Sequence, residues 1–152
     1  MAEKRRVVCP ECDSTNNVPA DRPADAAKCG RCHAKLFPHA PIALSGERAR
    51  KHLQNSDVPV IVDFWAPWCG PCRMMAPAYE RTAGQLEPNA RLLKLNTEND
   101  PSAAERYDIR SIPTLIMFRN GQIFFQAEDG IRDLTGGLGI PAEPLFRSRH
   151  SC

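Results

Sequence analysis

The stretch VIVDFWAPWCGPCRMMAP, residues 60–77, joins a β-branched and aromatic run to a Cys-x-x-Cys pair and then to a helical pattern. The run PVIVDFWA, residues 59–66, predicts a buried strand with one acid, Asp63, in its middle. The residues from Cys72 to Leu86 predict a helix that begins at the cysteine pair and bends at Pro77. A buried strand that leads directly into a helix is typical of α/β proteins, so this stretch decides the fold class.

The flanking segments extend the same alternation. Ser45 is a helix-capping residue, and helix-forming residues follow it to about Gln54. The segment ARLLKLNTE (90–98) predicts a strand, and DPSAAERYD (100–108) predicts a short helix. IPTLIMFRNGQIFF (112–125) predicts a hairpin, because Asn-Gly suits a two-residue turn. The order helix-strand-helix-strand-helix-strand-strand predicts an α/β layered domain in which crossover helices connect parallel strands.

The composition is that of an ordinary globular protein, with 42% hydrophobic and 25% charged residues among 152. A formal net charge of +2 gives no argument for binding to nucleic acid or to a membrane. The N-terminus carries too short an apolar run for a signal peptide, so we expect a cytoplasmic protein, and we expect a monomer. Cytoplasmic thiols stay reduced, and paired cysteines there are metal ligands or redox catalysts more often than structural bridges.

Residues 1–38 form a separate cysteine-rich module with few aliphatic residues, so we expect a metal rather than a core to hold it together. Sixteen residues separate two Cys-x-x-Cys pairs, a spacing typical of a four-cysteine zinc ribbon. Each two-residue gap lets both thiolates reach one tetrahedral ion at about 2.3 Å. The predicted ligands of a single zinc ion are Cys9, Cys12, Cys29 and Cys32.

Several other readings of these pairs remain open. They could be free cysteines, and iron could occupy the same four ligands in a rubredoxin-like site. The string CGRCH (29–33) also matches the attachment site of c-type haem, but haem attachment would leave Cys9 and Cys12 unexplained. Many zinc ribbons bind nucleic acid, yet the segment between the knuckles has no aromatic residue and three Asp against one Arg and one Lys.

The third pair, Cys69 and Cys72, lies between the predicted strand and the predicted helix. At a helix start, backbone N–H groups and the helix dipole stabilise a thiolate at Cys69. Cys72, one turn into the helix, should be more buried, so we expect an exposed attacking sulfur and a sheltered resolving one. A pair of inert core cysteines is the alternative.

The segment DFWAPWCGPC (63–72) resembles the active-site segment of thioredoxins. Together with the two preceding cysteine pairs, it makes the chain similar to the zinc-containing thioredoxin 2 subgroup, up to about Gly121 or Gln122. The resemblance implies a thioredoxin fold over residues 39–125, with a central mixed sheet flanked by helices. It also implies a protein thiol–disulfide oxidoreductase in which Cys69 attacks a substrate disulfide and Cys72 releases the product.

Further site residues follow from the same resemblance. Asp63 would be the buried carboxylate that takes the proton from Cys72, with a pKa raised by burial, although a surface acid at a strand edge is the alternative. Lys94 resembles the lysine that pairs with this acid, and a solvated strand lysine is the other interpretation. Pro113 matches the family's cis-proline, which leaves the preceding backbone at Ile112 free to pair with a substrate chain.

The resemblance also implies a docking surface, an electron donor and a cofactor set. Trp68, Gly70 and Pro71 would contact the substrate protein, whereas Trp65 would belong to the core. Thioredoxin reductase, using NADPH, would reduce the disulfide again, and the chain would need no bound organic cofactor besides the zinc. The alternative function is a zinc-ribbon binding module that uses the thioredoxin-like domain as a docking scaffold.

The segment after the hairpin departs from the family, whose last helix covers one face of the sheet. QAEDGIRD (126–133) resembles a translation of the sequencing-adapter DNA CAA GCA GAA GAC GGC ATA CGA GAT. The string GGTCTCGGCATTCCTGC gives GLGIPA (137–142) in one frame and SRHSC (148–152) in another. We therefore expect residues 126–152 to be a non-native tail. The lost helix would remove apolar side chains worth about 1.5–3 kcal/mol each, so the chain as written should be unstable.

Overall fold

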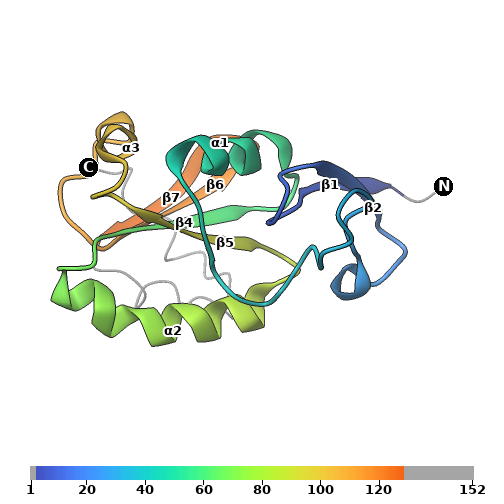
Figure 1. Cartoon of the computed structure of the whole chain (residues 1–152), viewed down its shortest axis with the longest axis horizontal. Coiled ribbons are helices and arrows are strands. Elements are labelled where there is room, and N and C mark those ends of the chain that lie inside the picture. Colours follow the sequence, from blue (N-terminus) through green and yellow to red (C-terminus); the bar gives the residue numbers. More distant parts are fainter. Residues whose placement is uncertain (1–2, 129–152) are drawn as a thin grey trace.

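A five-stranded mixed sheet with the strand order β3-β5-β4-β6-β7 forms the centre of the computed structural model, which describes residues 3–128 (Figure 1). The strands β3 and β4 are parallel to β5, whereas β6 is antiparallel to both β4 and β7. The sheet consists of β3 (Ile42–Ala43), β4 (Val60–Trp65), β5 (Arg91–Asn96), β6 (Thr114–Arg119) and β7 (Gln122–Glu128).

In the described part of the chain, three α-helices cover the two faces of this sheet. Figure 1 shows α1 (Gly46–Asn55) and α3 (Pro101–Arg106) on one face and α2 (Gly70–Leu86) on the other. The cap predicted at Ser45 is present, since its hydroxyl accepts a hydrogen bond from the Arg48 amide at 3.3 Å. The predicted α/β class, the mixed sheet and the order of these elements are confirmed. Within residues 3–128, no helix is both long and apolar enough to cross a membrane.

Alternation along the strands places one hydrophobic cluster on each face of the sheet. On the α1 and α3 face, Val62 and Phe64 of β4 pack with apolar residues of the helices. On the α2 face, Ile61 of β4 packs against Tyr79, whose hydroxyl shares its one hydrogen between the carbonyls of Ile61 at 3.1 Å and Leu93 at 2.8 Å. The α2 face therefore contains a buried polar link between the helix and two adjacent strands.

The N-terminal module has more regular structure than the sequence predicted. Strands β1 (Lys4–Val8) and β2 (Thr15–Pro19) form an antiparallel pair, and a 3-10 turn, η1 (Ala24–Ala26), follows. A small apolar cluster also forms, and its members include Val7, Val18, Leu36 and Phe37 of the module. Val58 of the α/β domain packs into the same cluster. The module therefore has a small apolar core in addition to its cysteine cluster.

The guanidinium of Arg91, at the start of β5, connects the module to the α/β domain. Arg91 is fully buried and donates to the carbonyls of Val8 at 3.0 Å and Leu36 at 2.7 Å. It also pairs with the buried carboxylate of Glu87 at 3.3 Å and lies 4.9 Å from the Phe37 ring centroid. A boundary between residues 38 and 39 stays a prediction, and buried polar contacts link the two sides.

The predicted non-native tail lies mostly outside the described residues. β7 extends to Glu128, so the structure describes only the first three residues of the segment 126–152. Ala127 pairs with Leu115 in the ladder between β6 and β7. The hairpin before it forms as predicted, with positive φ values of 54° at Asn120 and 80° at Gly121.

Candidate redox site and metal centre

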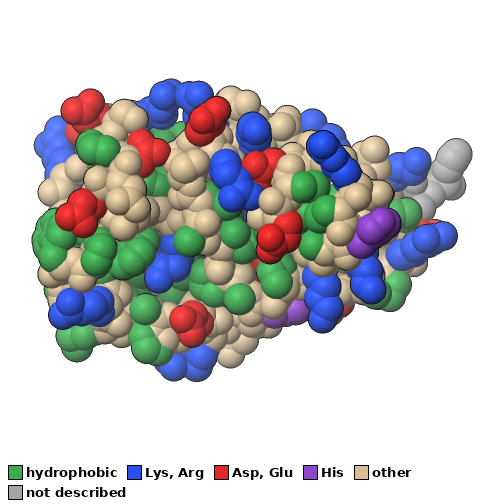
Figure 2. Space-filling model, in the orientation of Figure 1, with side chains coloured by type: hydrophobic (Ala, Val, Ile, Leu, Met, Phe, Trp, Pro, Cys, Tyr) green, Lys and Arg blue, Asp and Glu red, His purple; other side chains and the backbone are tan. Residues whose placement is uncertain are grey.

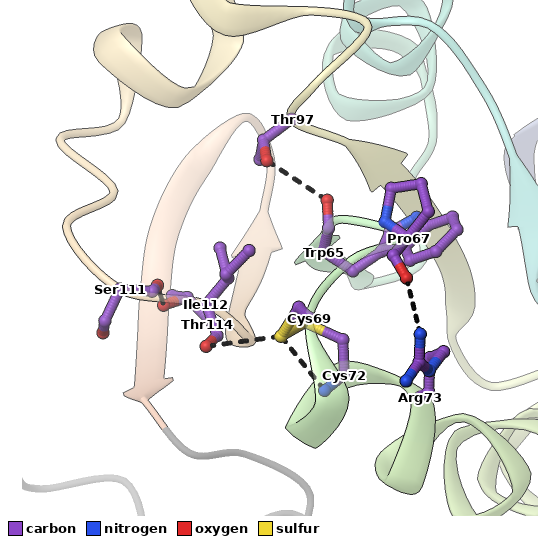
Figure 3. Close-up of a disulfide and its surroundings, with 9 residues drawn as sticks. All are labelled: Trp65, Pro67, Cys69, Cys72, Arg73, Thr97, Ser111, Ile112 and Thr114. Atoms are coloured by element: carbon purple, nitrogen blue, oxygen red, sulfur yellow. Dashed lines mark hydrogen bonds between the residues drawn. A yellow bond between two sulfur atoms is a disulfide. The ribbon is translucent and has the colours of Figure 1, made fainter.

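Cys69 and Cys72 form a disulfide at the beginning of α2, with their Cα atoms 5.3 Å apart (Figure 3). The buried strand β4 leads into this position, and Cys69 is the N-cap residue of the helix. Its sulfur accepts a hydrogen bond from the Cys72 amide at 3.2 Å. In the reduced form, the same amide and the helix N-terminus would stabilise a thiolate at Cys69.

The expected difference in exposure between the two cysteines is absent. Cys69 is 4% exposed and Cys72 is 3% exposed, so the prediction of an exposed attacking sulfur is wrong for this oxidised form. The reason is local packing, because the disulfide lies against Ala66 and the partly buried Trp65 and Ile112. Access to Cys69 therefore depends on neighbours that the sequence pattern did not reveal.

The loop before β6 faces the disulfide. Figure 3 shows Ile112 beside Cys69, and the Cys69 sulfur lies 3.8 Å from the Ile112 carbonyl oxygen. The peptide bond between Ile112 and Pro113 is cis, and Pro113 is buried. Thr114 fixes the end of this loop by donating its hydroxyl hydrogen to the Ser111 carbonyl at 2.6 Å. The structure thus brings Ile112 next to the cysteine pair, and Pro113 follows Ile112 through the cis bond.

Apolar side chains are exposed around the same end of α2. Figure 2 shows hydrophobic side chains gathered at the end of the molecule where α2 begins. Trp68 is 66% exposed, Pro71 is exposed and Gly70 is partly buried. Met74, near the start of α2, is also 82% exposed, and the sequence expectations for this surface did not include it. Helical periodicity could have found it, because residue 74 lies off the stripe that buries Cys72, residue 75 and residue 79.

Asp63 is 1% exposed in the middle of β4, and within residues 3–128 its Oδ1 atom has no hydrogen-bond partner. Burial raises the pKa of Asp63 to about 7, while the charge of Lys94 lowers the pKa by a smaller amount. Lys94 is the cross-strand neighbour of Asp63 in β5, but within the described residues the two form no ion pair. Instead, the Lys94 ammonium lies 4.5 Å from the Trp65 ring centroid. Trp65 is partly buried rather than a core residue.

The four cysteines of the N-terminal module converge on one point. Their sulfur atoms all lie within 4.8 Å of one another, and Cys32 is the exposed member of the set. Cys9 and Cys32 are 3.5 Å apart, and Cys12 and Cys29 are 3.7 Å apart. Tetrahedral zinc with bonds of about 2.3 Å places its sulfur ligands about 3.8 Å apart. The donor set and its spacing therefore fit one zinc ion.

The two halves of this cluster have the same local construction. Cys9 accepts from the Glu11 amide, and Cys29 accepts from the Arg31 amide, both at 3.3 Å. The residues after the second cysteine of each pair, Asp13 and His33, have positive φ values of 63° and 66°. Hydrogen bonds from the Cys32 and Arg31 amides lower the pKa of Cys29 to about 6, whereas burial raises the pKa of Cys9 to about 12. His33 does not belong to the cluster.

Comparison with known families separates the chain into the same two parts. Residues 40–136 match the family described as "Thioredoxin". Residues 8–34 match a zinc-ribbon family described as "Thioredoxin 2, N-terminal". The first match spans more than half of the chain, and the second covers all four clustered cysteines.

Individual relatives carry the same description. Thioredoxin C-3 of Corynebacterium nephridii is 41% identical over 111 residues, which cover 73% of this chain and 76% of the relative. Thioredoxin 1 of Nostoc sp. is 53% identical over 73 residues, or 48% of this chain and 68% of the relative. A mutant thioredoxin from Halobacterium salinarum superposes with a TM-score of 0.59 at 27% identity, covering 74% of this chain and 96% of that one. Spinach chloroplast thioredoxin F shares the fold, with a TM-score of 0.61 at 23% identity over 66% of this chain and 84% of that one.

Proposed function

The chain belongs to the thioredoxin family, and its similarity to thioredoxins supports a thiol–disulfide oxidoreductase activity. From this premise we propose that it reduces disulfide bonds in substrate proteins. The observation that carries the proposal is the Cys69–Cys72 disulfide at the N-terminus of α2, beside Ile112. A dithiol in this position would supply the two electrons that reduce one substrate disulfide. The oxidised form described above would be the product of that reaction.

The reaction would proceed in two exchange steps. The thiolate of reduced Cys69 attacks one sulfur of the substrate disulfide, which forms a mixed disulfide and expels the first substrate sulfur as a thiolate that takes up a proton. Cys72 then loses its proton and attacks the Cys69 sulfur, which breaks the mixed disulfide and expels the second substrate sulfur. The substrate gains two electrons, and the Cys69–Cys72 disulfide forms.

Asp63 would accept the proton from Cys72. Its buried position and its pKa of about 7 support this role, because a base works best when its pKa is near the working pH. The unpaired Oδ1 atom has unused capacity to bind a proton or a water molecule. Proton transfer at Asp63 would then accompany the second exchange step rather than the first.

Substrate proteins would dock on the exposed apolar surface around the disulfide. Trp68, which precedes Cys69 in the sequence, supplies a flat exposed ring, and the partly buried Gly70 and the exposed Pro71 follow Cys69. The backbone of Ile112, before the cis bond to Pro113, would pair with an extended substrate segment. The same surface would dock an NADPH-dependent thioredoxin reductase, which would return the disulfide to the dithiol.

The N-terminal module would bind one zinc ion through Cys9, Cys12, Cys29 and Cys32. The support is the match to a zinc-ribbon family together with sulfur spacings that fit a tetrahedral ion. Bound zinc would keep the four sulfurs as thiolates and would contribute to folding, without taking part in the exchange steps. We further propose that the protein is a cytoplasmic monomer with no bound organic cofactor.

Insulin reduction followed by turbidity would test the enzymatic proposal. With dithiothreitol as the reductant, we expect the protein to accelerate precipitation of the insulin B chain. The Cys69→Ser variant should not accelerate it. A matched control is Cys32→Ser, which should lower the zinc content but keep insulin reduction. Full activity of Cys69→Ser would contradict the proposal and favour a binding module with a docking scaffold. Metal analysis of the same samples should give one zinc per chain.

We also propose that residues 126–152 are not native. The support is the DNA string that accounts for two segments of the tail in two reading frames. Resequencing the source DNA across the codon for residue 125 would test this. An uninterrupted native reading frame that encodes the printed tail would refute it.

A further inference from the structure

The two outer edges of the β1–β2 sheet differ in how their backbone groups are satisfied. The outer edge of β1 is closed by the segment that follows α1. The Arg6 amide donates to the Asp57 carboxylate at 2.6 Å, and the Arg6 carbonyl accepts from the Asp57 amide at 2.8 Å. The Val8 amide donates to the Ser56 hydroxyl at 3.3 Å. No further strand could add to β1 without breaking these contacts.

Among the described residues, no segment pairs with the outer edge of β2. The Ala20 amide donates to the Glu3 carbonyl at 2.7 Å, which sets the alternation of the antiparallel ladder. It follows that Asn16 and Val18 bond to β1, whereas the backbone groups of Thr15 and Asn17 point away from it. Within residues 3–128, the outward N–H and C=O groups of Thr15 and Asn17 have no partner, and both residues are exposed.

A cavity of about 480 Å³ adjoins this open edge. It lies between β2 and the segment 22–30, and its lining combines apolar residues with two basic side chains, which we call the basic wall. No acidic side chain lines it, and its two cations form no ion pair within the described residues. The apolar lining includes Val18, Ala27 and Leu36, and the basic wall consists of Arg22 and Lys28.

The side chain of Asn16 holds the open edge in a fixed position. Its Nδ2 atom donates to the Ser14 carbonyl at 3.2 Å, and its Oδ1 atom accepts from the Gly30 amide at 2.9 Å. These bonds tie β2 to the second cysteine knuckle. A strand that added to this edge would therefore meet backbone groups that are already ordered, which lowers the entropic cost of binding.

We propose that the outer edge of β2 binds an extended, acidic segment of a partner protein as a third strand of the ribbon sheet. The unpaired groups of Thr15 and Asn17 are two residues apart along the strand, which is the spacing at which an extended chain presents its own groups to a neighbour. Alternate side chains of the added segment would point into the apolar cavity, and its carboxylates would pair with Arg22 and Lys28. This function does not depend on the redox reaction of Cys69.

Fluorescence anisotropy of the zinc-loaded chain with a labelled peptide would test the proposal. The probe is an eight-residue peptide of alternating valine and glutamate, and the control peptide carries lysine in place of glutamate. We expect the acidic peptide to bind and the basic one to fail. Amide resonances of Thr15 and Asn17 should shift on binding, and their hydrogen exchange should slow.

Two variants and a matched control make the test specific. Asn17→Pro removes an outward N–H without removing a bond to β1, and we expect binding about tenfold weaker. Lys28→Glu should weaken binding by a similar factor of about ten, because it places a carboxylate in the basic wall. Arg81→Glu reverses an exposed positive charge on α2, and Arg81 does not line the cavity. We expect its affinity to stay within about twofold of the parent.

Three results would overturn the proposal. The first is an absence of binding by the acidic peptide at about 1 mM, and the second is unchanged affinity in both Asn17→Pro and Lys28→Glu. The third is a different occupant. A single-stranded oligonucleotide that displaces the peptide would show a nucleic-acid site, and self-association that Asn17→Pro abolishes would show that a second copy occupies the edge. The zinc content of each variant is measured as well. A variant that keeps its zinc but binds the peptide weakly has lost the binding site, whereas a variant that loses its zinc has lost the fold of the ribbon.

Discussion

Arg91 gives the sharpest test of how the N-terminal module and the α/β domain are joined. Its guanidinium is fully buried, and it binds two carbonyls of the module as well as the carboxylate of Glu87. Glu87 in turn accepts a hydrogen bond from the His39 amide at 2.6 Å. We predict that Arg91→Met, which keeps most of the apolar volume, destabilises the whole protein.

The expected magnitude follows from the groups left without partners. Removing one member of a buried ion pair costs about 3–5 kcal/mol, because the remaining charge stays buried. The carbonyls of Val8 and Leu36 would each lose a donor, at about 1–3 kcal/mol per buried group. These losses are not additive, since Glu87 can become protonated in the variant. We therefore expect a loss of about 4 kcal/mol, a large part of a typical stability of about 5–15 kcal/mol.

Urea unfolding of the zinc-loaded chain, followed by tryptophan fluorescence, would measure this loss. The control is the double variant Arg91→Met with Glu87→Gln, which removes the unpaired charge and keeps an acceptor for the His39 amide. We expect the double variant to be more stable than Arg91→Met alone. A loss below about 1 kcal/mol in the single variant, or no recovery in the double variant, would refute the reasoning.

Three further predictions concern buried polar groups. Asp63→Asn should raise the free energy of unfolding by about 4 kcal/mol near pH 8 and change it little near pH 4. The reason is that the folded carboxyl keeps its proton up to a pKa of about 7, whereas the unfolded one loses it near the ordinary value of 3.8. Urea unfolding at both pH values checks this. Burial lowers the pKa of His52 to about 4, so the unfolded chain binds a proton below about pH 6.5 and the folded chain does not. Stability should thus fall by about 3 kcal/mol from pH 6.5 to pH 4, and unfolding curves of His52→Leu should show a smaller fall. Tyr79→Phe should lose about 1–2 kcal/mol in thermal or urea unfolding, since its hydroxyl bonds two buried carbonyls.

Local patterns were sufficient to predict the redox region and the hairpin. The apolar run of β4 and the Cys-x-x-Cys pair at the start of α2 are contiguous, so neighbours in sequence determine their arrangement. Asn120 and Gly121 adopt the positive φ values that a two-residue hairpin turn requires. The convergence of the four ribbon cysteines was also predictable, because metal-ligand spacing is a local signal.

Features that depend on distant contacts could not be predicted in this way. β3 has only two residues and is defined by pairing with β5, while β1 begins with three charged residues that hide its alternation. Arg91 lies in an otherwise ordinary strand, and no neighbour in sequence indicates that carbonyls 55 and 83 residues away surround its guanidinium. The burial of Cys69 was mispredicted because it depends on the loop at Ile112 and on the oxidised state.

The redox pair and the junction with the ribbon lie at opposite ends of α2. Cys69 is the N-cap of this helix and Glu87 is its C-cap, and a helix of 17 residues spans about 25 Å. At that distance, screening leaves little direct electrostatic effect of the Arg91–Glu87 pair on the Cys69 sulfur. Loss of Arg91 should therefore lower stability while leaving the rate of thiol–disulfide exchange in the folded fraction unchanged. Measuring insulin reduction by Arg91→Met well below its unfolding midpoint would check this separation, and a loss of activity without unfolding would contradict it.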